Sequence, residues 1–300
     1  MVMTEHLRPP WPLVEVAVQP KHRGEQERFA QALAELAVGD PSFQVTTDPE
    51  SGQTVIGGMS EAHLYEKLGL LRHSYDVDCY FGSPLVSYRE TIAGRVVQDH
   101  ALEMRTDAGA QSGRVRIAFE PDAAIGRCRL VCAIRGSAVS EHDARAVERG
   151  IGATMGILVG APLTRIRATL MEAETDGPGS PVTLLEAAAR NALREALQKA
   201  GTVVLEPVMR VGVTMPERYE GAVAGDLRSR RGRILGREVT GDAVTVTALA
   251  PLANLFGYEA SLRALSEGRA SYAMPFDSYQ PMPPRDGAGP PPAEAVALRA

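Results

Sequence analysis

The amino-acid sequence predicts an α+β protein of three domains, in which the first and last share one order of strands and helices and the middle one differs. Its 300 residues, 32.1 kDa in mass, exceed what one ordinary hydrophobic core organises. With 44% hydrophobic and 23% charged residues, the composition is that of a soluble globular protein. Alternating apolar runs and helical apolar stripes, separated by Gly and Pro, recur along the chain and mark the domains.

The first domain, residues 11–88, shows the order strand, helix, strand, strand, helix, strand. Valines alternate in residues 13–18, which indicates the opening strand. Helical apolar stripes follow in residues 25–37 and 60–71, and Ser60 is placed to cap the second helix. The remaining strands are expected at residues 43–47, 54–56 and 77–81. This βαββαβ order is that of the ferredoxin-like arrangement.

The last domain, residues 203–280, repeats this order with different residues. Pro216 suits the first turn of a helix, Gly232 suits its end, and Pro251 suits the start of a second helix. The strands are expected at residues 203–213, 234–239, 243–249 and 270–276. A second ferredoxin-like domain is therefore predicted, and residues 281–300, which are rich in Pro, are expected to form a disordered tail.

The middle domain, residues 89–202, mixes strands with two helices. One helix is expected over residues 141–155, and a second begins with the capping-box spacing that starts at Thr183. A polar loop rich in Gly and Pro is expected at residues 172–181, before the second helix. The clearest strands are residues 115–119, 127–134 and 165–170. The pattern predicts an α+β domain that differs from its two neighbours.

No catalytic, cofactor-binding or metal-ligating residue is expected. The sequence has no Gly-x4-Gly-Lys-Ser/Thr phosphate loop, no Asn-Lys-x-Asp guanine reader, no His-Glu-x-x-His and no Gly-x-Ser-x-Gly. Cys128 and Cys132 alternate in one expected strand, and too few other ligands lie near them to hold a metal. The sequence has only three cysteines, which indicates a reducing, cytoplasmic environment. No apolar run is long enough for a membrane span. Because the sequence shows no heptads of a coiled coil, we expect a monomer.

Three arginines crowd the end of an expected helix, in Gly-Asp-Leu-Arg-Ser-Arg-Arg-Gly at residues 225–232. Cations are favoured at this end of a helix, so a solvated helix end explains the cluster. Arginine forks also match phosphate oxygens, so a phosphate-contacting patch explains it as well. Charge alone leaves both interpretations open.

Acidic residues gather in the first third of the chain. Residues 10–90 hold 6 Lys and Arg against 12 Asp and Glu, whereas the counts are 14 against 13 in residues 91–202 and 9 against 9 in residues 203–280. An anionic partner must therefore be met by local arginine patches. The acidity also motivates a second hypothesis, a non-enzymatic interaction module whose first domain binds a protein partner. A merely solvated surface explains the charge equally well.

Several ordered motifs resemble elongation factor G, the ribosomal translocase. The last domain carries that factor's fifth-domain pattern in residues 205–209, 225–232, 251–258 and 262–276. The first domain resembles its third domain in Asp-Pro-Ser-Phe at residues 40–43, Gly-Met-Ser-Glu-Ala-His-Leu at 58–64 and Tyr-Arg-Glu-Thr-Ile at 88–92. Ala-Val-Glu-Arg-Gly-Ile at residues 146–151 is similar to part of the fourth domain. The resemblance covers roughly residues 11–280.

The resemblance implies both a fold and a role. It implies two ferredoxin-like βαββαβ domains flanking a ribosomal-protein-S5-like α+β domain. The family's fifth domain docks on ribosomal RNA near the stalk base and the sarcin–ricin loop, and its fourth domain reaches into the decoding centre. We therefore expect a ribosome-binding protein of translation elongation. Its RNA-contacting residues would be Arg228, Arg230, Arg231 and Arg233, with residues 256–258 supporting the fold.

Two departures from the family pattern limit this role. The GTPase domain and the β-barrel are missing from this sequence, so GTP and magnesium would enter only through an N-terminal region that it does not include. Either a fragment of a longer GTP-hydrolysing factor or a shortened, decayed paralogue would look like this. The family's basic stretch is replaced by Leu-Glu-Met-Arg-Thr-Asp-Ala at residues 102–108. At the tip loop, Glu174, Thr175, Asp176 and Gly177 place acidic groups where RNA phosphates are expected.

Overall fold

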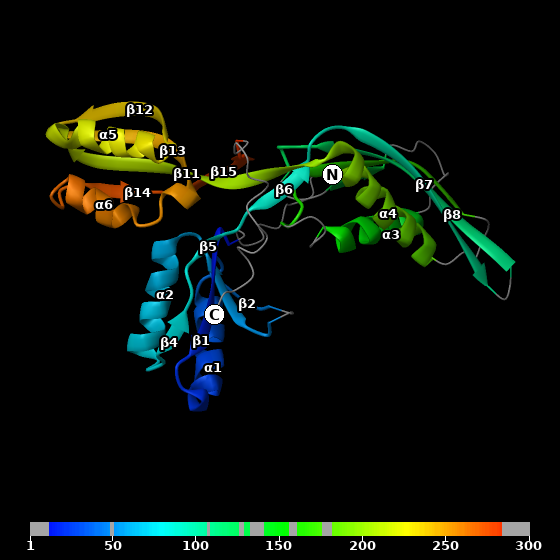
Figure 1. The fold of residues 1–300 in the computed structure, drawn as a ribbon, viewed down its shortest axis with the longest axis horizontal. Helices are drawn as coiled ribbons and strands as arrows, with labels where there is room; N and C mark the ends of the chain where they lie inside the picture. Colours follow the sequence, from blue (N-terminus) through cyan, green and yellow to red (C-terminus); the bar gives the residue numbers. More distant parts are fainter. Residues whose placement is uncertain are drawn as a thin grey trace. The chain divides into compact units, whose positions relative to one another are not determined.

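The computed structural model describes residues 12–48, 51–106, 109–125, 129–132, 141–155, 161–175 and 182–283. Its described residues form two compact units. Residues 12–87 and 206–280 make up one unit, and residues 88–205 with 281–283 make up the other (Figure 1). The first unit thus contains both of the expected ferredoxin-like domains, and the second contains the middle domain.

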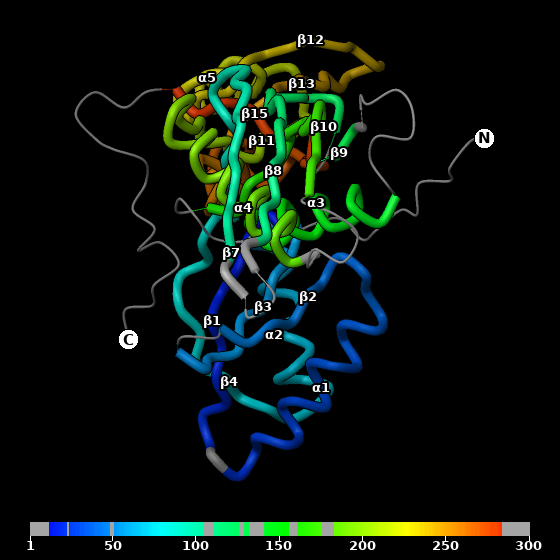
Figure 2. Tube along the Cα trace, turned by 90° about the vertical axis from the view of Figure 1, so that its right-hand side faces the viewer, coloured from blue at the N-terminus to red at the C-terminus, as the bar shows by residue number. Residues whose placement is uncertain are grey.

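The first ferredoxin-like domain has the predicted order of elements. They are β1 (Val14–Pro20), a 3-10 turn (Arg23–Glu25), α1 (Gln26–Gly39), β2 (Gln44–Thr47), β3 (Thr54–Gly58), α2 (Glu61–Ser74), β4 (Cys79–Phe81) and the short β5 (Leu85–Val86). The strands pair antiparallel in the order β2-β3-β1-β4, and β5 also pairs with β1. Helices α1 and α2 pack side by side (Figure 2). Ser60 caps α2, as predicted, by accepting a hydrogen bond from the His63 backbone N–H.

The last ferredoxin-like domain repeats the topology. Its elements are β11 (Thr202–Pro216), a 3-10 turn (Glu217–Tyr219), α5 (Glu220–Ser229), β12 (Arg233–Thr240), β13 (Ala243–Pro251), a 3-10 turn (Leu252–Asn254), α6 (Tyr258–Leu265), β14 (Ser271–Ala273) and β15 (Phe276–Pro281). The strand order β12-β13-β11-β14 matches that of the first domain. Buried residues alternate along β11 at Met209, Val211, Val213 and Met215, which directs one face of the sheet to the core. The prediction of two ferredoxin-like domains is confirmed.

The middle domain is built around one mixed sheet. Its elements are β6 (Arg89–Ile92), β7 (Val96–Thr106), β8 (Gly109–Pro121), β9 (Arg129–Cys132), α3 (Glu141–Thr154), β10 (Ile166–Thr175) and α4 (Val182–Ala200). The sheet order is β7-β8-β10-β9, with β9 and β10 parallel. Helices α3 and α4 approach closely at Gly150, where a Cβ atom would lie 2.2 Å from the Glu186 carbonyl oxygen. The α+β prediction for this domain is confirmed.

The structure corrects the prediction of a loop at residues 172–181. Strand β10 continues to Thr175, so Glu174 and Thr175 lie in a strand and not in a tip loop. The extension is stabilised by cross-strand partners, because Glu172 lies opposite Arg116 and Glu174 opposite Arg114. Asp176 and Gly177, the other two residues of the expected tip loop, lie outside the described residues.

Other boundaries also differ from the sequence pattern. Strand β11 crosses the expected start of the last domain, and its first four residues pair with β6 of the middle domain. The two compact units divide after Leu205. Pro216 ends β11, and a 3-10 turn precedes α5. The final strand is divided in two around Met274 and Pro275. Pro281 closes β15, and residues 284–300 of the expected tail lie outside the described residues.

Candidate nucleic-acid interface

The four arginines singled out from the sequence lie where α5 turns into β12, a segment we call the arginine turn (residues 228–233). The backbone N–H of Gly232 donates to the Leu227 carbonyl at 2.8 Å, and that of Arg231 donates to the Arg228 carbonyl at 3.1 Å. These two bonds form a Schellman motif that satisfies the last carbonyls of α5. A Cβ atom on Gly232 would lie 2.4 Å from the Leu227 carbonyl oxygen, so the turn requires glycine there.

Arg231 occupies the left-handed position of this motif, with φ of 63°. A side chain there costs about 1–2 kcal/mol, because its Cβ crowds the backbone. An ion pair offsets this cost, since the guanidinium donates to both carboxylate oxygens of Glu206 at 2.6 and 3.1 Å. The Glu206 side chain is only 4% exposed. Arg231 therefore neutralises a buried acid of β11 and fixes the turn.

Arg230 is held inside the domain by three hydrogen bonds. Its Nε donates to Asp226 Oδ2 at 2.8 Å, and its two terminal nitrogens donate to the Asn254 carbonyl at 2.9 Å and to Ser261 Oγ at 2.8 Å. The guanidinium also lies over the Tyr258 ring, 5.2 Å from the centroid. Its side chain is 18% exposed. These contacts tie the end of α5 to the start of α6.

Arg228 and Arg233 differ from the two arginines between them. Within the part of the chain that the structure describes, neither forms an ion pair, and both are exposed, as the paired Arg231 also is at 41%. Arg233 acts on Asp277 only through its charge. The pKa of Asp277 is held below its ordinary value first by a hydrogen bond from Arg210, and the charge of Arg233 contributes a smaller part. The structure thus brings the four predicted arginines together, and it divides them into two that bind partners within the domain and two exposed ones without an ion pair among the described residues.

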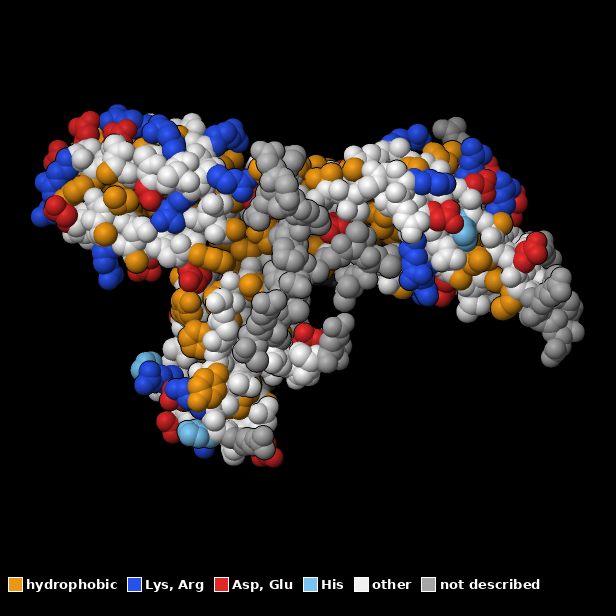
Figure 3. Space-filling view, in the orientation of Figure 1, with side chains coloured by type: hydrophobic (Ala, Val, Ile, Leu, Met, Phe, Trp, Pro, Cys, Tyr) orange, Lys and Arg blue, Asp and Glu red, His pale blue; other side chains and the backbone are white. Residues whose placement is uncertain are grey.

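Basic side chains gather over α5 and β12 on the surface seen in Figure 3. Most other arginines of this domain are matched by acids. Arg237 donates to Glu217 and Glu220 at 2.9 and 2.7 Å, and Arg210 donates to Asp277 at 2.7 Å. Exposed pairs of this kind contribute little free energy, but they reduce the positive charge offered to a partner. Within the described part of this domain, Arg228, Arg233 and Arg269 are exposed and form no ion pair, so their positive charge stays unmatched.

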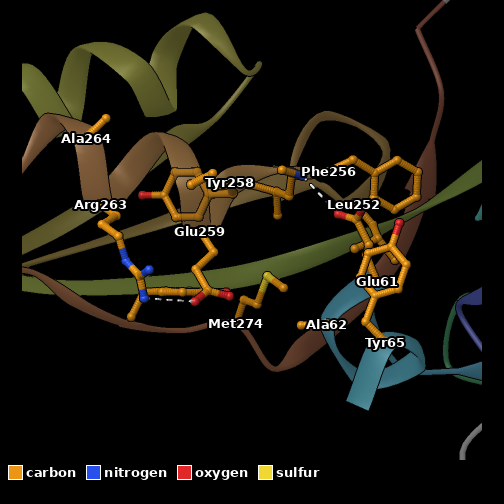
Figure 4. A pocket seen from close by; sticks show the side chains of 14 residues that line it. Glu61, Ala62, Tyr65, Leu252, Phe256, Tyr258, Glu259, Arg263, Ala264 and Met274 are labelled. Atoms are coloured by element: carbon orange, nitrogen blue, oxygen red, sulfur yellow. Dashed lines mark hydrogen bonds and ion pairs between the residues drawn. The ribbon is translucent and has the colours of Figure 1, made fainter. Parts of the chain in front are cut away.

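A groove of about 510 Å³ lies between α2 and α6, within the same compact unit (Figure 4). Its walls are mainly apolar and aromatic, with Tyr65, Phe256 and Tyr258 among them. Two carboxylates also line it: Glu61 accepts a hydrogen bond from the Gly257 backbone N–H at 2.9 Å, and Glu259 pairs with Arg263. Tyr258 is 1% exposed, in agreement with the expectation that residues 256–258 support the fold.

The acidic residues of the first ferredoxin-like domain are mostly engaged. Asp40 accepts hydrogen bonds from Lys67 at 2.7 Å and from the Ser42 hydroxyl at 2.6 Å, and it contacts His63 Nε2 at 3.0 Å. Burial alone would raise the pKa of Asp40, but these hydrogen bonds outweigh burial and hold the pKa well below its usual range. Asp78 pairs with Lys21. This network was not predicted from the sequence, because its members are separated by loops. A protein partner of this acidic domain stays a prediction.

At the end of β10 the acids are also paired. Glu174 lies 3.5 Å from Arg114, which forms a second ion pair with Asp99. The hydrogen bond from Arg114 lowers the pKa of Asp99. Within the described ranges, no group of three or more His, Cys, Asp and Glu side chains is placed to hold a metal ion. Nor is any helix in those ranges long and apolar enough to cross a membrane. Cys128 lies outside the described residues.

Three family models match consecutive parts of the chain. Residues 9–83 match elongation factor G domain III, residues 84–201 match elongation factor G domain IV, and residues 203–287 match the elongation factor G C-terminus. A crystal structure of a protein from Thermus thermophilus is similar at 31% identity, with a TM-score of 0.72. That similarity covers 92% of this chain and 42% of the Thermus chain. The chain therefore spans less than half the length of the solved protein it resembles.

Proposed function

Because the chain belongs to the elongation factor G family and comprises its third, fourth and fifth domains, we propose that it binds the ribosome through its last ferredoxin-like domain in translation elongation. The partner surface is ribosomal RNA near the stalk base and the sarcin–ricin loop, and the site of action is the cytoplasm. Within this proposal the three domains form a docking and positioning module, not a catalytic one.

One observation supports the proposal most strongly. The arginine turn presents Arg228 and Arg233 to solvent without an ion pair among the described residues, on a backbone that Arg230 and Arg231 hold in place. A guanidinium offers donors in a planar fork that matches phosphate oxygens. Phosphate contacts position a protein on nucleic acid without reading its sequence. Within this proposal, Arg228 and Arg233 contact phosphate, and Arg230 and Arg231 hold the turn that carries them.

Ribosome binding by paired variants tests the proposal. We expect Arg228→Ala/Arg233→Ala to lower the affinity for ribosomes about tenfold or more at moderate salt, because two phosphate contacts are lost. Arg28→Ala/Arg72→Ala is a matched control, since it removes two exposed arginines, each next to an aspartate of the first ferredoxin-like domain. The control should bind as the unaltered chain does. Equal affinity of the two double variants would contradict the proposal.

GTP hydrolysis enters the proposal only for a longer polypeptide. The chain spans 42% of the similar Thermus protein, so a GTPase domain would belong to a part of the polypeptide outside this sequence. In a longer factor, the three domains would transmit the state of a GTPase domain to the ribosome. The mass of the endogenous protein separates the two cases: a species near 32.1 kDa indicates a passive ribosome binder, and one more than twice that mass indicates a GTP-driven factor.

A further inference from the structure

The first turn of α6 is held between two oppositely charged side chains from two different helices. From α2, Glu61 Oε2 accepts a hydrogen bond from the Gly257 backbone N–H at 2.9 Å. From α5, Arg230 donates to the Asn254 carbonyl and to Ser261 Oγ at 2.9 and 2.8 Å. Figure 4 shows the Glu61 carboxylate directed at the backbone that precedes Tyr258. One acid and one base therefore hold the segment from Asn254 to Ser261, which contains the first turn of α6.

Glu61 supplies the side-chain acceptor that the N-cap of α6 lacks. The N-cap residue is Gly257, which has φ of 66° and no side chain to accept a hydrogen bond from the first turn. The first backbone N–H groups of a helix need acceptors, and its amino end favours negative charge. The Glu61 carboxylate provides both from another domain. Glu61 also acts on Tyr65, which lines the same groove. The pKa of Tyr65 is raised mainly by burial and, to a smaller extent, by Glu61.

Arg230, the basic member of this pair of side chains, connects α6 to the arginine turn. Arg230 touches α6 through Ser261 and the Tyr258 ring, and its backbone N–H donates to the Asp226 carbonyl at 3.1 Å, within the last turn of α5. Arg231 and Gly232 follow directly in the Schellman motif. A displacement of the first turn of α6 would therefore pull on Arg230, which lies within the arginine turn.

We propose that Glu61 is a positioning residue for the arginine turn. By capping α6 from the first ferredoxin-like domain, it holds the first turn of α6 against Arg230 and so fixes the direction in which Arg228 and Arg233 are presented. What those two arginines bind rests on the proposed function, whereas the positioning is a property of the free chain. A rotation of the first ferredoxin-like domain that withdraws Glu61 would loosen the arginine turn and weaken RNA binding.

Amide hydrogen exchange of the free, full chain tests the positioning step. In Glu61→Ala we expect the Gly257 amide to exchange about tenfold faster or more, because a charge-assisted hydrogen bond is lost. The Gly232 amide, which closes the arginine turn, should exchange several-fold faster, about threefold. Glu61→Gln keeps an acceptor without the charge, so it should restore part of the protection at both amides. Glu66→Gln removes an exposed charge from the same helix and should change neither.

Two exchange results would overturn the inference. If Glu61→Ala leaves the Gly257 amide as protected as before, Glu61 does not cap α6. If Gly257 loses protection while Gly232 keeps it, the cap exists but does not position the arginine turn. A circular dichroism spectrum like that of the unaltered chain confirms that each variant is folded.

Ribosome affinity supplies the second readout. We expect Glu61→Ala to weaken binding about two- to fivefold, less than the loss of Arg228 and Arg233, because the arginines remain present but are held loosely. In a chain that already carries Arg228→Ala/Arg233→Ala, adding Glu61→Ala should change the affinity no further. An additional loss there would contradict an action through the arginine turn. The exchange experiment needs no RNA, so a failure of the proposed function would show only in the binding of the arginine variants.

Discussion

The two ferredoxin-like domains share a topology but end their first helices in different ways. Helix α1 has no basic residue in its last turn and is followed by Asp40, whose carboxylate gathers Lys67 and Ser42 into an internal network. Helix α5 ends in the arginine turn, where Arg230 and Arg231 serve the same internal purpose and leave Arg228 and Arg233 exposed. In one fold, the end of the first helix can therefore have its charged side chains paired within the domain, or it can leave two of them unpaired at the surface. Function therefore follows from the side chains placed there and not from the fold.

The largest effect is expected at the glycine that closes α5. In Gly232→Ala the new Cβ would lie 2.4 Å from the Leu227 carbonyl oxygen, and backbone atoms cannot move aside as a side chain can. We expect this substitution to lower the free energy of unfolding by about 3 kcal/mol, near the upper end for overpacking. Urea unfolding followed by circular dichroism measures the change. A loss of less than about 0.5 kcal/mol would show that the turn tolerates a side chain.

The next largest effect is expected at Asp40, which directly follows α1. Asp40→Asn removes the charge that Lys67 and Ser42 stabilise, and should cost about 2 kcal/mol at neutral pH. Because folding lowers the pKa of Asp40, its contribution is complete above the ordinary value of 3.8 and is lost as the pH falls below that value. The unaltered chain should therefore lose stability below about pH 4 more steeply than the variant. Parallel acid unfolding curves would rule out this role for Asp40.

A smaller effect separates the two classes of arginine. Arg230→Ala removes three hydrogen bonds from a mostly buried side chain and should cost about 1–2 kcal/mol. Arg228→Ala should change stability by less than about 0.5 kcal/mol, because it breaks no ion pair among the described residues. Thermal unfolding of both variants gives the comparison. If the two lose equal stability, the division of the cluster into supports and contacts is wrong.

The smallest effect has the opposite sign and is expected at the glycine that ends α1 in the first domain. Gly39 is the last residue of α1, and a Cβ atom there meets nothing within 4 Å. Gly39→Ala should therefore stabilise the chain by about 0.5 kcal/mol, since Ala is the better helix former and Gly loses more entropy on folding. The same urea titration that measures Gly232→Ala detects it. A destabilised Gly39→Ala variant would mean that the end of α1 is as constrained as that of α5.

Much of the fold was predictable from the sequence, because both ferredoxin-like domains alternate or repeat their apolar residues at the spacing of the elements they form. The long hairpin of β7 and β8 was only partly predicted. Its exposed half is polar and carries charged cross-strand pairs such as Asp99 with Arg114, so hydrophobic periodicity fades there. Charged partners on β8 also extend β10 beyond its apolar part, since Glu172 lies opposite Arg116 and Glu174 opposite Arg114.

The sequence predicted the candidate site as a cluster of arginines, but it did not predict which of them form contacts within the domain. Charge crowding and the family motifs pointed to Arg228, Arg230, Arg231 and Arg233 without saying which are bound within the domain. That distinction depends on partners 24 to 31 residues away, namely Glu206, Asn254 and Ser261. Glu61, which lies 196 residues before Gly257, could be recognised only once the two domains were folded. Long-range polar contacts of this kind leave no periodic signal in a sequence.

The salt dependence of ribosome binding tests the central claim most directly. For the unaltered chain and for Arg228→Ala/Arg233→Ala, the logarithm of the binding constant should fall linearly with the logarithm of the salt concentration. Each lost phosphate contact reduces the slope by about 0.7 to 0.9, so the double variant should be shallower by roughly 1.5. Arg28→Ala/Arg72→Ala should keep the original slope. An unchanged slope in Arg228→Ala/Arg233→Ala would contradict the account, because those two arginines would then touch no phosphate.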